Sequence, residues 1–138
     1  MRKPDWANRL NTYIEQHLNT PFEWGTFDCC LFTANAVEAM TGQDFAAEFR
    51  GHYSSLRGSK HALKKYGAGD LRLTIEAKFG PMCSRLCAGR GDIALVKTPL
   101  GDALGIVWSG KIWAAAEHGL MTLPMSSCLG CWEVPCHQ

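Results

Sequence analysis

Apolar residues follow two different patterns in the first third of the chain. Over residues 6–18 they recur every three or four positions, which predicts a helix with one buried stripe that begins after Asp5. From Cys29 to Met40 nearly every position is apolar, and a helix that is apolar on all faces lies inside a protein. Asp28 is a favourable N-cap for this segment, and Gly42 is a favourable end. The pattern therefore predicts a buried central helix.

The remaining residues divide into a helical part and a strand part. Two amphipathic helices are expected, one capped by Ser59 and running to Gly67, the other capped by Asp70 and ending at Gly80. After residue 89, short apolar runs alternate with Gly, Pro and Ser, which is typical of a strand meander with a tight turn at 109–110. The expected strands are Asp92–Val96, Ala103–Trp108, Lys111–Ala116, Leu120–Pro124 and Cys131–Val134. Helices followed by antiparallel strands predict an α+β fold, with the central helix packed on the strands 92–96 and 103–107.

Length and charge limit the possible functions. The 138 residues, 46% hydrophobic and 20% charged, suit a single domain (1–138) with a substantial core. The formal net charge is +1, from 14 basic and 13 acidic residues, so no overall field draws the chain to nucleic acid or to an anionic membrane. A local basic group is typical of a solvated helix face. It comprises Arg57, Lys60, His61, Lys64 and Lys65.

The sequence predicts a protein made in a reducing cytoplasm. No apolar run approaches the roughly 20 residues that span a bilayer, so we expect no membrane-spanning segment. Arg2 and Lys3 resemble the start of a signal peptide, but Asp5, Arg9 and Glu15 interrupt the apolar region that would follow. Seven cysteines, an odd number, argue against a complete disulfide framework and leave burial, metal binding or catalysis as their roles.

Asp28 and Cys29 stand where the central helix would begin, and this position has two interpretations. A thiol at a helix N-terminus feels the positive end of the helix dipole, which lowers its pKa and favours the nucleophilic thiolate. Alternatively, Cys29 and Cys30 are small hydrophobic residues at the start of a core helix, with Cys30 facing the core. Taken without other motifs, these residues favour packing.

A longer series of motifs favours catalytic ancestry. It comprises Trp24-Gly25-Thr26-Phe27-Asp28-Cys29, the buried helix, Arg90-Gly91-Asp92-Ile93-Ala94-Leu95 and Leu104-Gly105-Ile106-Val107. In the order and spacing of these motifs the chain resembles the NlpC-like, papain-type cysteine peptidases of phage tails. It is also similar to a small family of phage and prophage proteins that have Trp-Gly-x-x-Asp-Cys-Cys and a late Gly-Leu-x-x-Leu-Pro, here residues 119–124. The resemblance is strongest over residues 21–134.

The resemblance implies a papain-like fold and a mechanism. A thiolate attacks a peptide carbonyl in peptidoglycan, a histidine carries the proton, and a third polar residue orients the histidine. Asp28 and Cys29 match the start of the nucleophile helix. The histidine is expected two residues before Gly105, where this chain has Ala103, and the orienting residue is expected at 113–114, which are Trp and Ala. Two of the three catalytic positions are therefore apolar, and without a base Cys29 is expected to stay a thiol.

Another histidine could replace the missing base. His118 is the best candidate, because it follows the expected strand 111–116, although a histidine just before Gly119 is also typical of an exposed turn. His17 is expected near the polar side of the first helix. The other histidines have no context that points to the site: His52, His61 and His137.

The late cysteines form a second candidate site. Cys128 and Cys131 have a usual metal-ligand spacing, and Cys83 and Cys87 lie earlier in the chain, with Cys136 as an alternate ligand. Four thiolates could hold zinc or an iron–sulfur cluster. The alternative is that Cys128 and Cys131 pack in the last strand and that the chain has no cofactor.

The resemblance also implies a setting. It predicts a structural component of a phage tail tip or baseplate hub, built on a catalytically degenerate cysteine-peptidase scaffold. Its partners would be other tail-tip or hub proteins and peptidoglycan, and it would be located in the virion after synthesis in the host cytoplasm. The alternative is an active peptidoglycan endopeptidase that uses Cys29 as nucleophile during cell-wall penetration. A metal-stabilised interaction module is compatible with the structural hypothesis.

Overall fold

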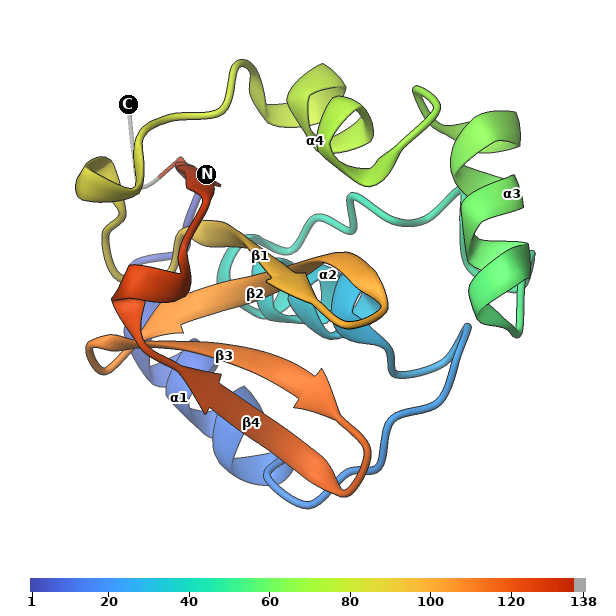
Figure 1. Ribbon diagram of the computed structural model, residues 1–138. Helices are drawn as coiled ribbons and strands as arrows, with labels where there is room; N and C mark the ends of the chain where they lie inside the picture. The colour runs from blue at the N-terminus through green and yellow to red at the C-terminus, as the bar shows by residue number, and fades with distance from the viewer. Residues whose placement is uncertain (136–138) are drawn as a thin grey trace.

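A computed structural model describes residues 1–135 (Figure 1). Four helices come first in the described chain: α1 (Trp6–Gln16), α2 (Cys29–Thr41), α3 (Leu56–Tyr66) and α4 (Leu71–Phe79). The strands follow: β1 (Ile93–Thr98), β2 (Gly101–Trp108), β3 (Lys111–Ala116), β4 (Gly119–Leu123) and β5 (Gly130–Trp132). Short 3-10 turns are η1 (Arg85–Cys87) and η2 (Met125–Ser127). The predicted α+β class is confirmed. None of the helices in residues 1–135 is long and apolar enough to cross a membrane.

The five strands form one antiparallel sheet in the order β4-β3-β2-β1-β5. The first four strands are a meander, and β5 returns to the free side of β1. The predicted tight turn joins β2 to β3, because Ser109 and Gly110 both have positive φ (54° and 74°), as a type I′ hairpin requires. The last strand is shorter than predicted, since the backbone N–H of Val134 turns to Asp92 instead of continuing the ladder.

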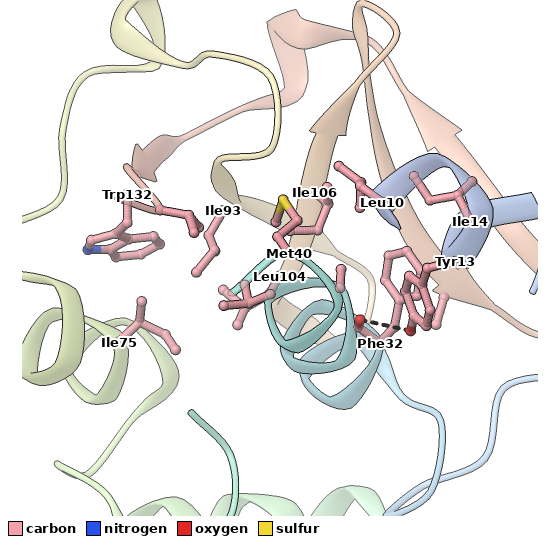
Figure 2. Packing of buried hydrophobic residues seen from close by; sticks show 14 of the residues in the cluster. Leu10, Tyr13, Ile14, Phe32, Met40, Ile75, Ile93, Leu104, Ile106 and Trp132 are labelled. Atoms are coloured by element: carbon pink, nitrogen blue, oxygen red, sulfur yellow. Dashed lines mark hydrogen bonds between the residues drawn. The ribbon is translucent and has the colours of Figure 1, made fainter. Parts of the chain in front are cut away.

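Helix α2 is the buried central helix that the apolar pattern predicts. Leu31, Phe32 and Met40 have no exposed surface. The helix lies closest to β2 and β3, rather than to β1 and β2 as predicted, although Ile93 and Leu95 of β1 join the same core. Figure 2 shows Phe32 and Met40 among side chains of α1 and the sheet. This packing fixes the direction in which the N-terminus of α2 points.

The start of α1 and the end of its buried stripe differ from the prediction. Asp5 occupies the N-cap position, but its carboxylate accepts a hydrogen bond from Arg9 Nε at 2.8 Å instead of capping the backbone. The helix ends at Gln16, so Leu18, which the pattern placed in the stripe, is 41% exposed.

The cap of α3 also differs, whereas the cap of α4 is as predicted. Ser55 caps α3 and accepts a hydrogen bond from Gly58 N. The predicted cap, Ser59, lies inside the helix and donates its hydroxyl to Leu56 O at 2.6 Å. Both serines satisfy the local preference, and only Ser55 has the extended backbone that a cap requires. Asp70 caps α4 by accepting from Leu73 N at 2.8 Å.

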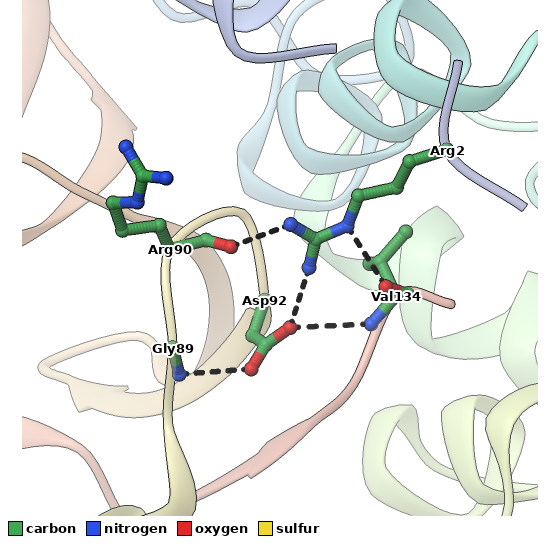
Figure 3. Close-up of polar contacts among 5 residues, drawn as sticks. All are labelled: Arg2, Gly89, Arg90, Asp92 and Val134. Atoms are coloured by element: carbon green, nitrogen blue, oxygen red, sulfur yellow. Dashed lines mark hydrogen bonds and ion pairs between the residues drawn. The ribbon is translucent and has the colours of Figure 1, made fainter. Parts of the chain in front are cut away.

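A buried ion pair joins the beginning and the end of the described chain to the start of β1 (Figure 3). The guanidinium of Arg2 donates to Asp92 Oδ1 at 2.8 Å, to the carbonyl of Arg90 and to the carbonyl of Val134. Asp92 also accepts from the backbone N–H of Gly89 and of Val134. The Gly-Asp motif before β1 therefore holds three distant segments together.

Candidate functional site

A cleft of about 510 Å³ opens where the N-terminus of α2 faces the β1–β2 hairpin and α3. Asp28, Cys29 and Ala103 line this cleft, so the structure brings together the predicted nucleophile position and the predicted histidine position. The other lining residues include the aromatic side chains Phe22, Trp24, Phe49 and Tyr53. The cleft is therefore the candidate site.

The carboxylate of Asp28 has a structural role, because it accepts three hydrogen bonds from neighbouring segments. It is buried, its Oδ1 accepts from Leu31 N at 2.9 Å, and its Oδ2 accepts from Gly25 N at 3.0 Å and from the Tyr53 hydroxyl at 2.5 Å. Burial and the Asp28 charge raise the pKa of Tyr53 well above its usual value, so Tyr53 stays a donor. Sequence reasoning missed Tyr53, because it lies 25 residues from Asp28 in a loop without a motif.

The backbone conformation and close packing of Gly25 explain why a glycine follows Trp24 in the motif. Its φ is +82°, and a Cβ at this position would stand 2.0 Å from the carbonyl oxygen of Tyr53. Only glycine fits such a close backbone approach. The neighbouring Trp24 packs edge-to-face with Phe22, with the ring centroids 4.8 Å apart, and both rings line the cleft. The motif therefore shapes the wall of the cleft.

The thiol of Cys29 is less acidic than its position at a helix N-terminus predicts. Burial, and then the charge of Asp28, raise the pKa of Cys29 to about 11. The helix N-terminus therefore does not decide the net pKa of Cys29, because desolvation and the Asp28 charge outweigh its contribution. The Sγ atom donates to the carbonyl of Ala115 over 3.7 Å, a contact that suits a thiol. Burial and Asp28 also raise the pKa of Cys30, to about 12.

The positions expected for the other catalytic residues carry no proton-transfer group. Ala103 is 5% exposed and lines the same cleft as Cys29. Trp113 donates its indole N–H to the carbonyl of Trp108 at 2.9 Å, and Ala114 is fully buried. Within residues 1–135, no histidine lines the cleft. Cys29 therefore has no imidazole partner among the lining residues.

His118, the predicted substitute base, lies on the turn between β3 and β4. Its side chain is 90% exposed, and its ring lies 3.9 Å from the adjacent Glu117. His17 is half-buried, with Nδ1 2.9 Å from the carbonyl of Tyr13 and its ring stacked on Phe27. His52 contacts the Tyr66 hydroxyl, and His61 is exposed. His137 lies outside the described residues.

The predicted metal ligands gather partly around a second cavity. Cys83, Cys87 and Cys131 line this cavity of about 380 Å³, whereas the buried Cys128 donates its thiol to the carbonyl of Gly130 at 3.1 Å. Among the residues that the structure describes, no group of three or more His, Cys, Asp or Glu side chains could hold a metal ion. Cys136, the alternate ligand, lies outside those residues. The zinc or iron–sulfur hypothesis stays a prediction.

Comparison with known proteins identifies a family for this chain. A search of curated proteins gave no match. A family model described as a domain of unknown function, DUF6950, matches residues 1–134. The matched span includes the N-terminal Arg2, the cleft around Cys29, the late cysteine pairs and every helix and strand of the described chain. The chain therefore belongs to the DUF6950 family.

Proposed function

We propose that this chain is a structural component of a phage tail tip or baseplate hub, built on a papain-like scaffold that has lost its peptidase activity. The main support is the cleft, where Cys29 lies at the N-terminus of α2 and Ala103 stands at the position expected for the catalytic histidine. The placement in a phage tail rests on the resemblance to phage and prophage proteins, which is carried by the motifs from Trp24-Gly25 to the late Gly-Leu-x-x-Leu-Pro segment.

The chemistry of acyl transfer supports the loss of activity. A pKa of about 11 leaves about one Cys29 thiolate in 10,000 molecules at pH 7. The leaving amine must also receive a proton, and Ala103 has none to give. General acid–base help contributes about 100- to 10,000-fold to such reactions, so its loss adds to the shortage of thiolate.

The cleft retains features that suit protein binding. Its lining is largely apolar and includes the aromatic rings of Trp24 and Tyr53, together with the exposed Lys60 and Lys64 of α3 and Asp102 of β2. Such a mixture of apolar surface and a few charged groups is typical of sites that hold a ligand or a peptide segment. In the proposed function, the partner is another protein of the tail tip or hub.

The first test is release of soluble peptides from purified cell-wall sacculi by the isolated protein. We expect no release above background from the wild type or from Cys29→Ala. Cys83→Ala is the matched control, because Cys83 lies outside the cleft. Release by the wild type and by Cys83→Ala that disappears in Cys29→Ala would establish the endopeptidase instead, and His118→Ala would then test the proton shuttle.

The second test addresses the structural role. A phage or prophage that lacks this chain is complemented with the wild type, with Cys29→Ala or with the core variant Val37→Asp. We expect the wild type and Cys29→Ala to restore infectious particles equally, and Val37→Asp to restore none. If Cys29→Ala accumulates in folded form and yields no infectious particles, the thiol is needed and the proposal fails.

A further inference from the structure

Cys83 and Cys131 face each other directly across a short antiparallel bridge. The backbone N–H of Cys83 donates to the carbonyl of Cys131 at 2.8 Å, and the N–H of Cys131 donates back to the carbonyl of Cys83 at 3.0 Å. A reciprocal pair of this kind places the two Cα atoms about 5.5 Å apart. Disulfides span Cα separations of about 4.4–6.8 Å, so the bridge holds the two residues within reach of a covalent bond.

We propose that Cys83 and Cys131 are a covalent modification site that closes to a disulfide. Both residues line the same cavity of about 380 Å³. Their thiols donate to the carbonyls of Pro81 and Ser84, so closure requires both side chains to leave these contacts. In a hydrogen-bonded pair the opposed Cβ atoms lie toward the wide end of about 4.5–5.5 Å, and a disulfide needs about 3.5–4.5 Å, so closure requires an approach of about 1–2 Å. The segment that carries Cys83 joins α4 to β1 through the single turn η1, and the proposal requires this segment to make that movement.

The reaction is thiol–disulfide exchange with a low-molecular-weight disulfide such as oxidised glutathione. The exposed Cys83 attacks first as its thiolate and forms a mixed disulfide, and one glutathione thiol leaves. The buried Cys131 then loses its proton to solvent and attacks the Cys83 sulfur, and the second glutathione leaves as a thiol. Two protein thiols and one small disulfide become one protein disulfide and two small thiols.

The other two cysteines of the cluster are less suited to this bond. Cys87 follows Cys83 across η1, and its N–H donates to Ser84 O within that turn rather than to a strand opposite Cys83. Cys128 forms no backbone bridge with Cys83, because its N–H donates to the carbonyl of Met125 at the end of η2.

This proposal is independent of the tail-tip function, because the cysteine cavity and the cleft of Cys29 share no lining residue. The experiment treats the full chain with oxidised glutathione and maps peptides by mass spectrometry without reduction. We expect a peptide that links Cys83 to Cys131, and a Tm roughly 5–15 °C higher than that of the reduced protein. Dithiothreitol should reverse both changes.

Two variants make the test specific. Cys83→Ser removes an exposed thiol without disturbing the core, and it should abolish both the linked peptide and the rise in Tm. Cys87→Ser should preserve both. A link between Cys83 and Cys87, a stable mixed disulfide without ring closure, or one equivalent of tightly bound zinc that prevents oxidation would each overturn the proposal.

Discussion

Two opposing effects act on the thiol of Cys29, and their sizes decide its chemistry. The N-terminus of a helix stabilises a nearby negative charge by about 0.3–1 kcal/mol, which lowers the pKa of a thiol by less than one unit. Burial and the adjacent Asp28 act in the other direction and raise the pKa from 9.0 to about 11. The same aspartate that caps α2 therefore disfavours the thiolate form of the half-buried Cys29 beside it.

The pKa of Cys29 can be measured from its rate of alkylation. In a Cys30→Ser background, which removes the neighbouring thiol, the rate at Cys29 should rise with pH and have its midpoint near 11. Asp28→Asn retains a side-chain oxygen that can cap α2 and removes the negative charge, so it should move the midpoint downward. Mass spectrometry of the peptide that contains Cys29 gives the rate. A wild-type midpoint at or below 8.5 would show that the thiolate is stabilised after all.

At the scale of elements, α2 determines both the core and the site. Its apolar surface on all sides packs against α1, β2 and β3, and this packing directs its first residue into the cleft. The helix is stopped by Gly42, which adopts the left-handed conformation with φ of 82°. A substitution in the middle of α2 should therefore lower the stability of the fold, and any effect on the chemistry of the cleft should follow from that loss.

Val37 tests the contribution of α2 to stability. It is 3% exposed, so Val37→Asp buries an unpaired charge and should prevent folding. The milder Val37→Ala should lower the free energy of unfolding by about 2 kcal/mol. Glu38→Ala, at the exposed neighbouring position, is the control and should change it by less than about 0.5 kcal/mol. Urea denaturation measures all three, and equal values for Val37→Ala and Glu38→Ala would contradict the packing.

At the scale of the whole molecule, Arg2 joins segments that are far apart in the sequence. Its guanidinium reaches the residues just before β1 and the residues after β5, and its partner Asp92 is buried with it. Removal of one member of a buried ion pair leaves the other charge without compensation, and the cost exceeds that of losing a surface pair.

Arg2→Met should reduce the free energy of unfolding by about 3–5 kcal/mol. Arg9→Met is a matched control, because Arg9 forms an exposed ion pair with Asp5 at the same distance of 2.8 Å, and its loss should cost less than about 1 kcal/mol. Thermal or urea denaturation at neutral pH compares the two. Similar losses in the two variants would show that burial of Arg2 and Asp92 contributes little.

Local patterns in the sequence determined much of the fold. The apolar run of α2, the cap at Asp70, the turn at Ser109-Gly110 and the order of helices before strands depend on residues only a few positions apart. Propensity, capping and periodicity act over such short distances, so these elements could be predicted. The choice between Ser55 and Ser59 could not, because both satisfy the same local preference and only the surrounding backbone distinguishes them.

Some features of the candidate site could also be predicted from the sequence, and others depend on the tertiary structure. Its positions, Cys29 at a helix start and Ala103 on a strand, followed from the motif order, and the tertiary structure placed both in one cleft. The bond from Tyr53 to Asp28, the pairing of Arg2 with Asp92 and the opposition of Cys83 and Cys131 were decided only by the packed chain. These contacts join residues 25, 90 and 48 positions apart, and no short-range preference specifies them. The pKa of the Cys29 thiol is likewise decided by the tertiary structure, because its desolvation depends on which segments pack around it.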